Sequence, residues 1–284
     1  MSAFEIKQYL SSFFTDEPTT IRPVSGGDIG RSYQLEAPTS KFFIKHYPQI
    51  EGKRMASTEA GALNFLAQNT PFTIPKTLYP ELLDQGIIAM QWMEEKEITA
   101  HDWQTFGRNL AKMHLVHGHS FGWKEDNFMG TQPQKNKPFS SWAAFYTQQR
   151  IYPLISKLVE RAPEFPHPSV EGIEQRIKDE YPEESPSLLH GDLWSGNKMM
   201  TQNGFSLYDP AIYFGHREID LAMTQLFGGF DPSFIDSYQE IYPLESGWRS
   251  RLPLTQLYPL LVHAVLFGGG YIDTCKTIIK KNFH

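Results

Sequence analysis

The chain has 284 residues, of which 40% are hydrophobic and 14% aromatic, so it can bury a sizeable core as one large domain or two lobes. Its 26 basic residues are fewer than its 32 acidic ones and form no long run, which disfavours nucleic acid as a partner. The single cysteine, Cys275, excludes an intrachain disulfide and suits a reducing cytoplasm, where we expect the protein to reside. We expect no signal peptide and no membrane span, because no basic segment precedes an apolar core and every apolar run is short.

The N-terminal region predicts a short helix followed by strands. Residues 2–14 place Phe4 and Leu10 at the spacing of a short amphipathic helix. A glycine-rich turn follows in IRPVSGGDIGRSYQLEA, where Gly26 and Gly27 would let backbone N–H groups approach phosphate oxygens. An ordinary hairpin is the alternative, because the spacing is not that of the dinucleotide-binding motif.

A lysine and a glutamate form the next predicted feature. The run KFFIKHY predicts a strand that carries Lys45, which by itself would suit a solvent-facing position. In the following helix, Glu59 lies on an apolar stripe, four residues from both Met55 and Leu63. An unpaired buried carboxylate costs several kcal/mol, on the order of 3–5, so Glu59 needs a cation, and Lys45 is the candidate closest in sequence. Such a strand lysine, held by a helix glutamate, binds the α- and β-phosphates of a nucleotide in phosphotransferases.

A boundary between lobes is predicted near residues 94–97. The segments PFTIPKTLYP and IIAMQWMEE predict two strands, and the second gives way abruptly to the acidic EEKE. We therefore divide the chain into an N-lobe, residues 1–94, and a C-lobe, residues 95–284. The backbone of Gln91, Trp92 and Met93 would line the cleft, where adenine could bind main-chain groups. A buried strand followed by a solvated acidic turn describes the same residues equally well.

The C-lobe is predicted to be mostly helical. An amphipathic helix is expected from Ala100 to His117, another begins near Ser141, and two more flank the glycines at 268–270. Between the first two lies a long polar loop, FGWKEDNFMGTQPQKNKPF. His114 and its neighbouring histidines do not predict a metal site, because no other ligand cluster lies nearby.

The catalytic chemistry is predicted in SLLHGDLWSGNKMM, a polar loop between apolar ends. Asp192 and Asn197 have the spacing of phosphotransfer loops, in which the aspartate accepts a hydroxyl proton and the asparagine ligates Mg²⁺. An ordinary turn would use the same residue types. A second acidic position, Asp209 in SLYDPAIYFGH, follows a short apolar run as a metal-binding aspartate would. Further on, Asp220 is expected to cap a helix.

These features together resemble the fructosamine kinase family, also called ketosamine kinases. The resemblance rests on SGGDIGRSY, FFIKHY, EAGALNFL, DNFMGTQPQKN, HGDLWSGN, DPAIYFGHREIDLAM and LFGGGY, and it covers nearly the whole chain. It implies an α+β, bilobal protein-kinase-like fold with a small β-rich N-lobe and a larger, mostly helical C-lobe. It also implies ATP- and Mg²⁺-dependent phosphorylation of the sugar 3-hydroxyl of a ketosamine, free or on a protein lysine.

The resemblance assigns roles to individual positions. Asp192 would be the catalytic base, and Trp194 would contact the substrate, although a core-filling tryptophan is the alternative. The nucleotide-binding residues would be Gly26, Gly27, Lys45, Glu59, Gln91, Trp92 and Met93, and the metal ligands Asn197 and Asp209.

The sequence leaves open whether fructosamines, ribulosamines or erythrulosamines are used. A kinase for another hydroxylated amine, such as an aminoglycoside or choline, is the alternative enzyme, and an inactive nucleotide-binding module is the non-enzymatic one. All four of Lys45, Asp192, Asn197 and Asp209 are present, which disfavours the inactive module. The oligomeric state is not defined by the sequence, and a monomer is favoured.

Overall fold

The computed structural model describes residues 3–13, 18–24 and 30–283, and within it the chain forms two compact units. The first unit comprises Met1–Asp102 together with Gly196–Pro210, and the second comprises Trp103–Ser195 together with Ala211–His284. The first unit therefore extends beyond the boundary expected at residue 94. It also includes a later segment, Gly196–Pro210, that the sequence interpretation placed in the C-lobe.

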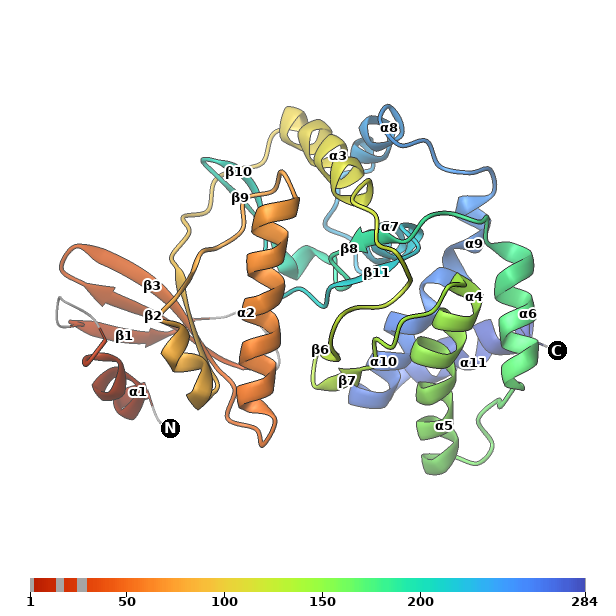
Figure 1. Cartoon of the computed structure of the whole chain (residues 1–284), viewed down its shortest axis with the longest axis horizontal. Helices are drawn as coiled ribbons and strands as arrows, with labels where there is room; N and C mark the ends of the chain where they lie inside the picture. The colour runs from red at the N-terminus through yellow and green to blue at the C-terminus, as the bar shows by residue number, and fades with distance from the viewer. Residues whose placement is uncertain (1–2, 14–17, 25–29, 284) are drawn as a thin grey trace. The chain divides into compact units, whose positions relative to one another are not determined.

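The first unit is built on an antiparallel sheet (Figure 1), with strand order β1-β2-β3-β5-β4. In the central strand, Lys45 lies opposite Ser32 on one neighbour and Ile88 on the other. The N-terminal helix packs through the buried Ile6 and Leu10, whereas Phe4 is 73% exposed, contrary to its expected place on the apolar side. The elements before the Gly196–Pro210 segment are α1 (Ala3–Leu10), β1 (Thr20–Pro23), β2 (Arg31–Ala37), β3 (Ser40–His46), α2 (Gly52–Asn69), β4 (Thr77–Leu78), η1 (Pro80–Gln85) and β5 (Ile87–Gln91).

The long helix α2 has the buried stripe that its sequence predicts. Met55, Leu63 and Leu66 are all buried, and so is Glu59, which lies between them on the same side. Packing this stripe places the Glu59 carboxylate inside the unit, so its charge must be compensated there.

A hairpin from much later in the chain completes the first unit. Strands β9 (Lys198–Thr201) and β10 (Gly204–Leu207) pair with each other. The Thr73 backbone bonds to the hairpin in both directions: its N–H donates to Phe205, and its carbonyl accepts from Leu207. The N–H of Lys96 donates to the Met200 carbonyl. These main-chain bonds explain why the segment belongs to the first unit.

The second unit is mostly helical around a large apolar core that includes Phe145, Ile173, Leu189 and Leu261. The Ser141 hydroxyl accepts a hydrogen bond from the N–H of Ala144 and so caps α4, where a helix start was expected. Its helices are α3 (Ala100–His114, which begins at the end of the first unit), α4 (Trp142–Phe145), the π-helical turn η2 (Tyr146–Ile151), α5 (Tyr152–Arg161), α6 (Val170–Glu180), α7 (Glu218–Leu226), α8 (Ser233–Gln239), α9 (Trp248–Thr255), α10 (Leu257–Phe267) and α11 (Gly270–Asn282).

Two short strand pairs lie among these helices (Figure 1): β6 (Asn127–Met129) with β7 (Gln132–Gln134), and β8 (Ser187–Leu189) with β11 (Tyr213–Gly215). The polar loop that carries Asp192 follows β8, and it leads into the short turn η3 (Ser195–Asn197). The predicted fold class, a β-rich N-terminal part with a mostly helical remainder, is confirmed. No helix in the described ranges has both the length and the apolar character that a membrane span requires.

Candidate active site

A buried charge cluster centred on Lys45 lies in the first unit. The Lys45 Nζ is 3.2 Å from Glu59 Oε2 and 2.8 Å from Asp209 Oδ1. The Tyr47 hydroxyl also donates a hydrogen bond to Glu59. Lys45 and Glu59 are 4% and 6% exposed, while the Asp209 side chain keeps 24% of its surface. The predicted pair of Lys45 and Glu59 is confirmed, and Asp209 is a second partner that no local pattern indicated.

In this cluster the single Lys45 ammonium is the counter-charge for two carboxylates, those of Glu59 and Asp209. Burial acts to lower the pKa of Lys45, but the Asp209 and Glu59 carboxylates outweigh it and hold that pKa well above its ordinary value. Burial raises the pKa of Glu59 to about 7 despite the attraction of Lys45. Lys45 therefore stays charged, and Glu59, the more deeply buried acid, is the less well compensated of the two.

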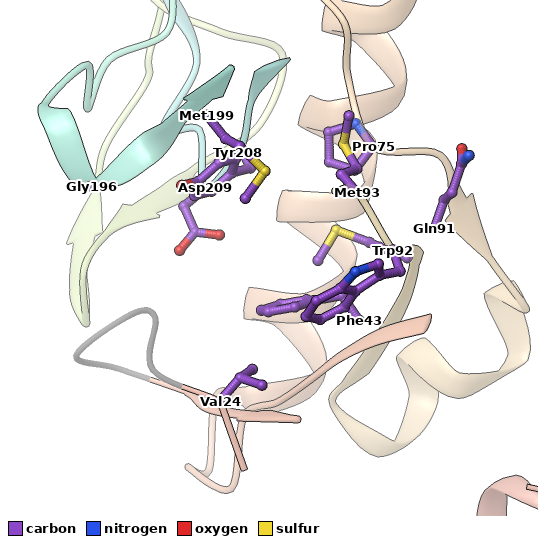
Figure 2. A pocket seen from close by; sticks show the side chains of 11 residues that line it. Val24, Phe43, Pro75, Gln91, Trp92, Met93, Gly196, Met199, Tyr208 and Asp209 are labelled. Carbon is purple, nitrogen blue, oxygen red and sulfur yellow. The ribbon is translucent and has the colours of Figure 1, made fainter. Parts of the chain in front are cut away.

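An apolar pocket adjoins this cluster within the first unit (Figure 2). Its wall is formed by Val24, Phe43, Pro75, Met90, Gln91, Trp92, Met93, Gly196, Met199, Tyr208 and Asp209. Figure 2 shows the Gln91 side chain turned away from the other lining residues, so Gln91 contributes mainly backbone. The predicted segment Gln91–Met93 thus lines a pocket together with Asp209. Phe43 and Met199 were not predicted to do so, because apolar residues at such positions look like ordinary core.

The segment before Asp209 holds Asn197 beside it. The Asn197 Nδ2 lies 3.5 Å from the Asp209 carbonyl oxygen, and the Tyr208 N–H donates to the Asn197 carbonyl at 3.2 Å. Asp209 itself has a φ of 53°, in the left-handed region that non-glycine residues rarely adopt. Such backbone conformations are often found at functional sites, where the surrounding contacts maintain them. The structure therefore brings Lys45, Glu59, Asn197 and Asp209 together in one unit.

Asp192 lies in the second unit, in the loop after β8, and its side chain is half-buried. Just before it, Gly191 has a φ of 82°, and a Cβ there would overlap the Ala211 carbonyl oxygen. The Ala211 N–H donates to the His190 carbonyl at 2.9 Å. The two residues preceding Asp192 are therefore packed tightly against Ala211, and no side chain other than hydrogen fits at Gly191.

The carboxylate of Asp220 holds the same loop from another side. It accepts hydrogen bonds from the N–H groups of His190 and Gly191, at 2.7 and 2.9 Å, and it is fully buried with His114 Nε2 at 3.3 Å. The prediction that Asp220 caps a helix is wrong. Helix α7 already begins at Glu218, and the Asp220 side chain serves the distant loop instead of its own helix end.

Trp194, the predicted substrate residue, is half-buried in the second unit. Its ring meets Phe227 edge-on at 6.1 Å, and Phe227 in turn lies 4.9 Å from the His263 ring. Part of Trp194 packs on the helical core, in line with the core-filling alternative, and part remains accessible. The two predicted phosphate-loop residues, Gly26 and Gly27, lie outside the described residues.

The antiparallel sheet, the buried lysine–glutamate pair and the loop carrying Asp192 define a protein-kinase-like phosphotransferase. Solved structures support this fold. A choline kinase from Streptococcus pneumoniae aligns over 98% of both chains with a TM-score of 0.62 at 15% identity. A Thermobifida fusca protein solved as a candidate fructosamine-3-kinase aligns over 98% of this chain and 99% of its own, with a TM-score of 0.81 at 33% identity.

The chain belongs to the fructosamine kinase family, whose model matches residues 3–284. A probable ketoamine kinase of Synechocystis is 36% identical over 265 residues, which cover 92% of this chain and 89% of the relative. A probable ketoamine kinase of Enterococcus faecium is 37% identical over 256 residues, which cover 88% of this chain and 90% of the relative. The protein is therefore a kinase that phosphorylates a hydroxyl group of a small sugar-amine substrate, as the sequence resemblance predicted.

Proposed function

We propose that this kinase uses Mg²⁺ and ATP to phosphorylate the sugar 3-hydroxyl of ketosamines, either small molecules or protein lysines that carry a rearranged sugar. The observation that carries the proposal is the position of Lys45, held between Glu59 and Asp209 beside an apolar pocket. A fixed cation next to an apolar pocket suits a nucleotide, which joins a flat base to a chain of phosphates.

The nucleotide would bind through the first unit alone. The base would lie between the apolar side chains of the pocket and hydrogen-bond to the backbone of Gln91–Met93. Lys45, whose ammonium is charged and held by Glu59, would neutralise the α- and β-phosphates. Gly26 and Gly27 would offer backbone N–H groups to the same phosphates.

The donor set at Asp209 fits magnesium. Asp209 offers a carboxylate that is partly accessible in the pocket wall. Asn197, whose Nδ2 lies 3.5 Å from the Asp209 carbonyl oxygen, would offer its amide oxygen. Within residues 3–13, 18–24 and 30–283, no three His, Cys, Asp or Glu side chains gather as a metal site. Few protein ligands, all of them oxygen, suit Mg²⁺, which takes its other ligands from phosphates and water. When bound, the ion would neutralise charge that develops on the phosphate oxygens.

The acceptor would bind at the second unit. Asp192 would orient the sugar hydroxyl and accept its proton as the phosphoryl group is transferred. The hydrogen bonds from His190 and Gly191 to Asp220 hold the backbone that carries this carboxylate. Trp194 would contact the sugar or the cationic amine, for which an accessible aromatic face is suited.

A substrate panel tests the proposal. ATP consumption is measured with ribulosyl-, erythrulosyl- and fructosyl-lysine, and beside them with an aminoglycoside and choline, with Asp192→Asn as the background control. Phosphorus NMR of the product then locates the phosphate on the sugar. We expect turnover of at least one ketosamine, with phosphate on the 3-hydroxyl. Faster turnover of choline or the aminoglycoside, or phosphate on another hydroxyl, would contradict the proposal.

A further inference from the structure

An arginine without a carboxylate partner lies at the centre of the second unit. Arg150, in the π-helical turn η2, is 0% exposed. Among the residues that the structure describes, its hydrogen-bond acceptors are neutral carbonyl and amide oxygens, not carboxylates. Its nitrogens donate instead to the Lys135 carbonyl at 2.5 Å and to Asn136 Oδ1 at 2.6 Å. Burying a cation without an opposite charge is costly, so a stabilising role alone does not explain this residue.

Aromatic rings supply part of the compensation. The guanidinium carbon lies 4.1 Å from the centre of the Tyr213 ring, 4.6 Å from Phe145 and 5.3 Å from Tyr258. The negative faces of these rings attract a cation, and the planar guanidinium can stack on them. Arg150 is thereby held in one orientation, with N–H groups directed at Lys135 and Asn136, which directly follow β7.

Because Arg150 can only donate hydrogen bonds, it determines which way the buried side-chain amides next to it are oriented. A guanidinium can only donate, so the Asn136 oxygen must face it and the Asn136 Nδ2 must face the other way. There Nδ2 donates to Asn127 Oδ1 at 2.9 Å, and Gln134 Nε2 donates to the same oxygen at 2.8 Å. With its oxygen so occupied, Asn127 can only donate onward through Nδ2, and it does so to the Ile212 carbonyl at 2.9 Å.

The chain ends on the residues that hold the Asp192 loop. Gln134 Nε2 also donates to the Ala211 carbonyl at 3.0 Å, while its oxygen accepts from the Tyr258 hydroxyl at 2.8 Å. Ala211 is the residue whose N–H binds His190 and whose carbonyl lies against Gly191. The carbonyl groups of Ala211 and Ile212 therefore receive donors whose direction is set by Arg150.

We propose that Arg150 is a positioning residue for Asp192: as an obligate donor it orients the buried amides of Asn136, Asn127 and Gln134, which hold Ala211 and, through it, the backbone before Asp192. The inference rests on the proposed role of Asp192 in phosphoryl transfer. It gives a function to the DNFMGTQPQKN segment, which the nucleotide and metal sites leave unexplained.

Matched substitutions separate positioning from stability. Gln134→Leu removes the donor to Ala211. Gln132→Leu makes the same change on the same strand, at a side chain that accepts a hydrogen bond from the Lys157 ammonium. Arg150→Met is compared with Arg161→Met, whose guanidinium donates to the Val265 carbonyl. Displacing a reacting group by about 1 Å can cost about a hundredfold in rate. We expect kcat to fall about tenfold or more in Gln134→Leu and Arg150→Met, and to stay within about twofold in both controls.

A third variant keeps the test valid if these proteins fold poorly. Asn136→Asp gives Arg150 a carboxylate but cannot donate to Asn127, so positioning is lost while the buried cation gains a partner. We expect its kcat to fall about tenfold while its melting temperature stays at or above that of wild type. Nucleotide affinity by calorimetry should remain within about twofold in every variant, because the pocket residues all belong to the first unit.

Hydrogen exchange makes the test independent of the substrate. In the protein without added ligands, exchange at peptides containing Gly191 and Ala211 should be about tenfold faster in Gln134→Leu than in Gln132→Leu, since the Ala211 anchor is lost. Unchanged exchange, or faster exchange with wild-type kcat, would overturn the positioning role. If the wild type phosphorylates no ketosamine, the proposed function fails, and the exchange comparison still decides whether these residues hold the loop.

Discussion

Replacing Lys45 with methionine and Glu59 with glutamine, singly and together, measures the coupling within the buried charge cluster. Lys45→Met leaves two carboxylates, Glu59 and Asp209, without their shared cation, and breaking a buried pair in this way costs about 3–5 kcal/mol. Glu59→Gln retains an oxygen that can accept from the Tyr47 hydroxyl, and Lys45 keeps Asp209 at 2.8 Å, so the loss should be about 1–3 kcal/mol.

The double replacement should cost much less than the sum of the two single ones. With both charges gone, the remaining carboxylate, Asp209, is 24% exposed and can be hydrated. We therefore expect a coupling free energy of about 1–3 kcal/mol, measured by urea unfolding of all four proteins at about pH 8. This pH lies above the pKa of about 7 for Glu59, so the wild-type carboxylate is ionised.

An exposed pair between α2 and η1, formed by Lys53 and Asp84, provides the control. Lys53 Nζ lies 2.5 Å from Asp84 Oδ1, but the two side chains are 66% and 68% exposed, so water screens their interaction. The cycle Lys53→Met with Asp84→Asn should give a coupling below about 1 kcal/mol. Strictly additive losses for Lys45 and Glu59, or a coupling no larger than that of the control pair, would refute the cluster as described. The same cycle in kcat/KM shows whether the coupling extends to catalysis.

Three aspartate substitutions test the remaining parts of the site. Asp192→Asn should preserve the fold and nucleotide binding but lower kcat about a hundredfold or more, and turnover within a few-fold of wild type would reject Asp192 as the base. Asp209→Ala should abolish Mg²⁺-dependent nucleotide binding in calorimetry, because it removes the main charge that would hold the ion; an unchanged affinity would be incompatible with that role. Asp220→Asn presents an amide to one of two buried N–H donors, so it should cost about 2–3 kcal/mol and lower the melting temperature by several degrees; an unaltered melting temperature would contradict the hydrogen bonding seen to His190 and Gly191.

Local periodicity in the sequence was enough to predict the pair of Lys45 and Glu59. The i, i+4 spacing of Glu59 from Met55 and Leu63 placed a carboxylate on a buried face, and the requirement for a counter-charge named the nearest strand lysine. Both steps depend on residues that are close in the chain, where helix geometry determines which side chains lie on the same face. The same logic predicted most of the helices and strands that surround the pair.

Residues whose partners are distant in the chain were interpreted less well. Asp220 sits in the first turn of a helix, where an acidic side chain commonly caps, and only the approach of His190 and Gly191 in space gives it a different role. Arg150 is a harder case, because arginine is rarely buried and nothing in the sequence YTQQRIY indicates three aromatic rings around it. Burial patterns alone cannot identify such a chain of hydrogen bonds, because which group donates and which accepts depends on the arrangement of several side chains in space.

The boundary between the two units shows why long-range pairing matters for function. Asp209 ends the segment that belongs to the first unit and pairs there with Lys45, whereas Ala211 belongs to the second unit and is bound there by His190 and Gln134. Pro210 alone separates these two anchored residues, and its ring restricts φ to about −65°. The side chains that contact them, Lys45 for Asp209 and Gln134 for Ala211, lie far away in sequence, so a motif can mark these residues without revealing what holds them.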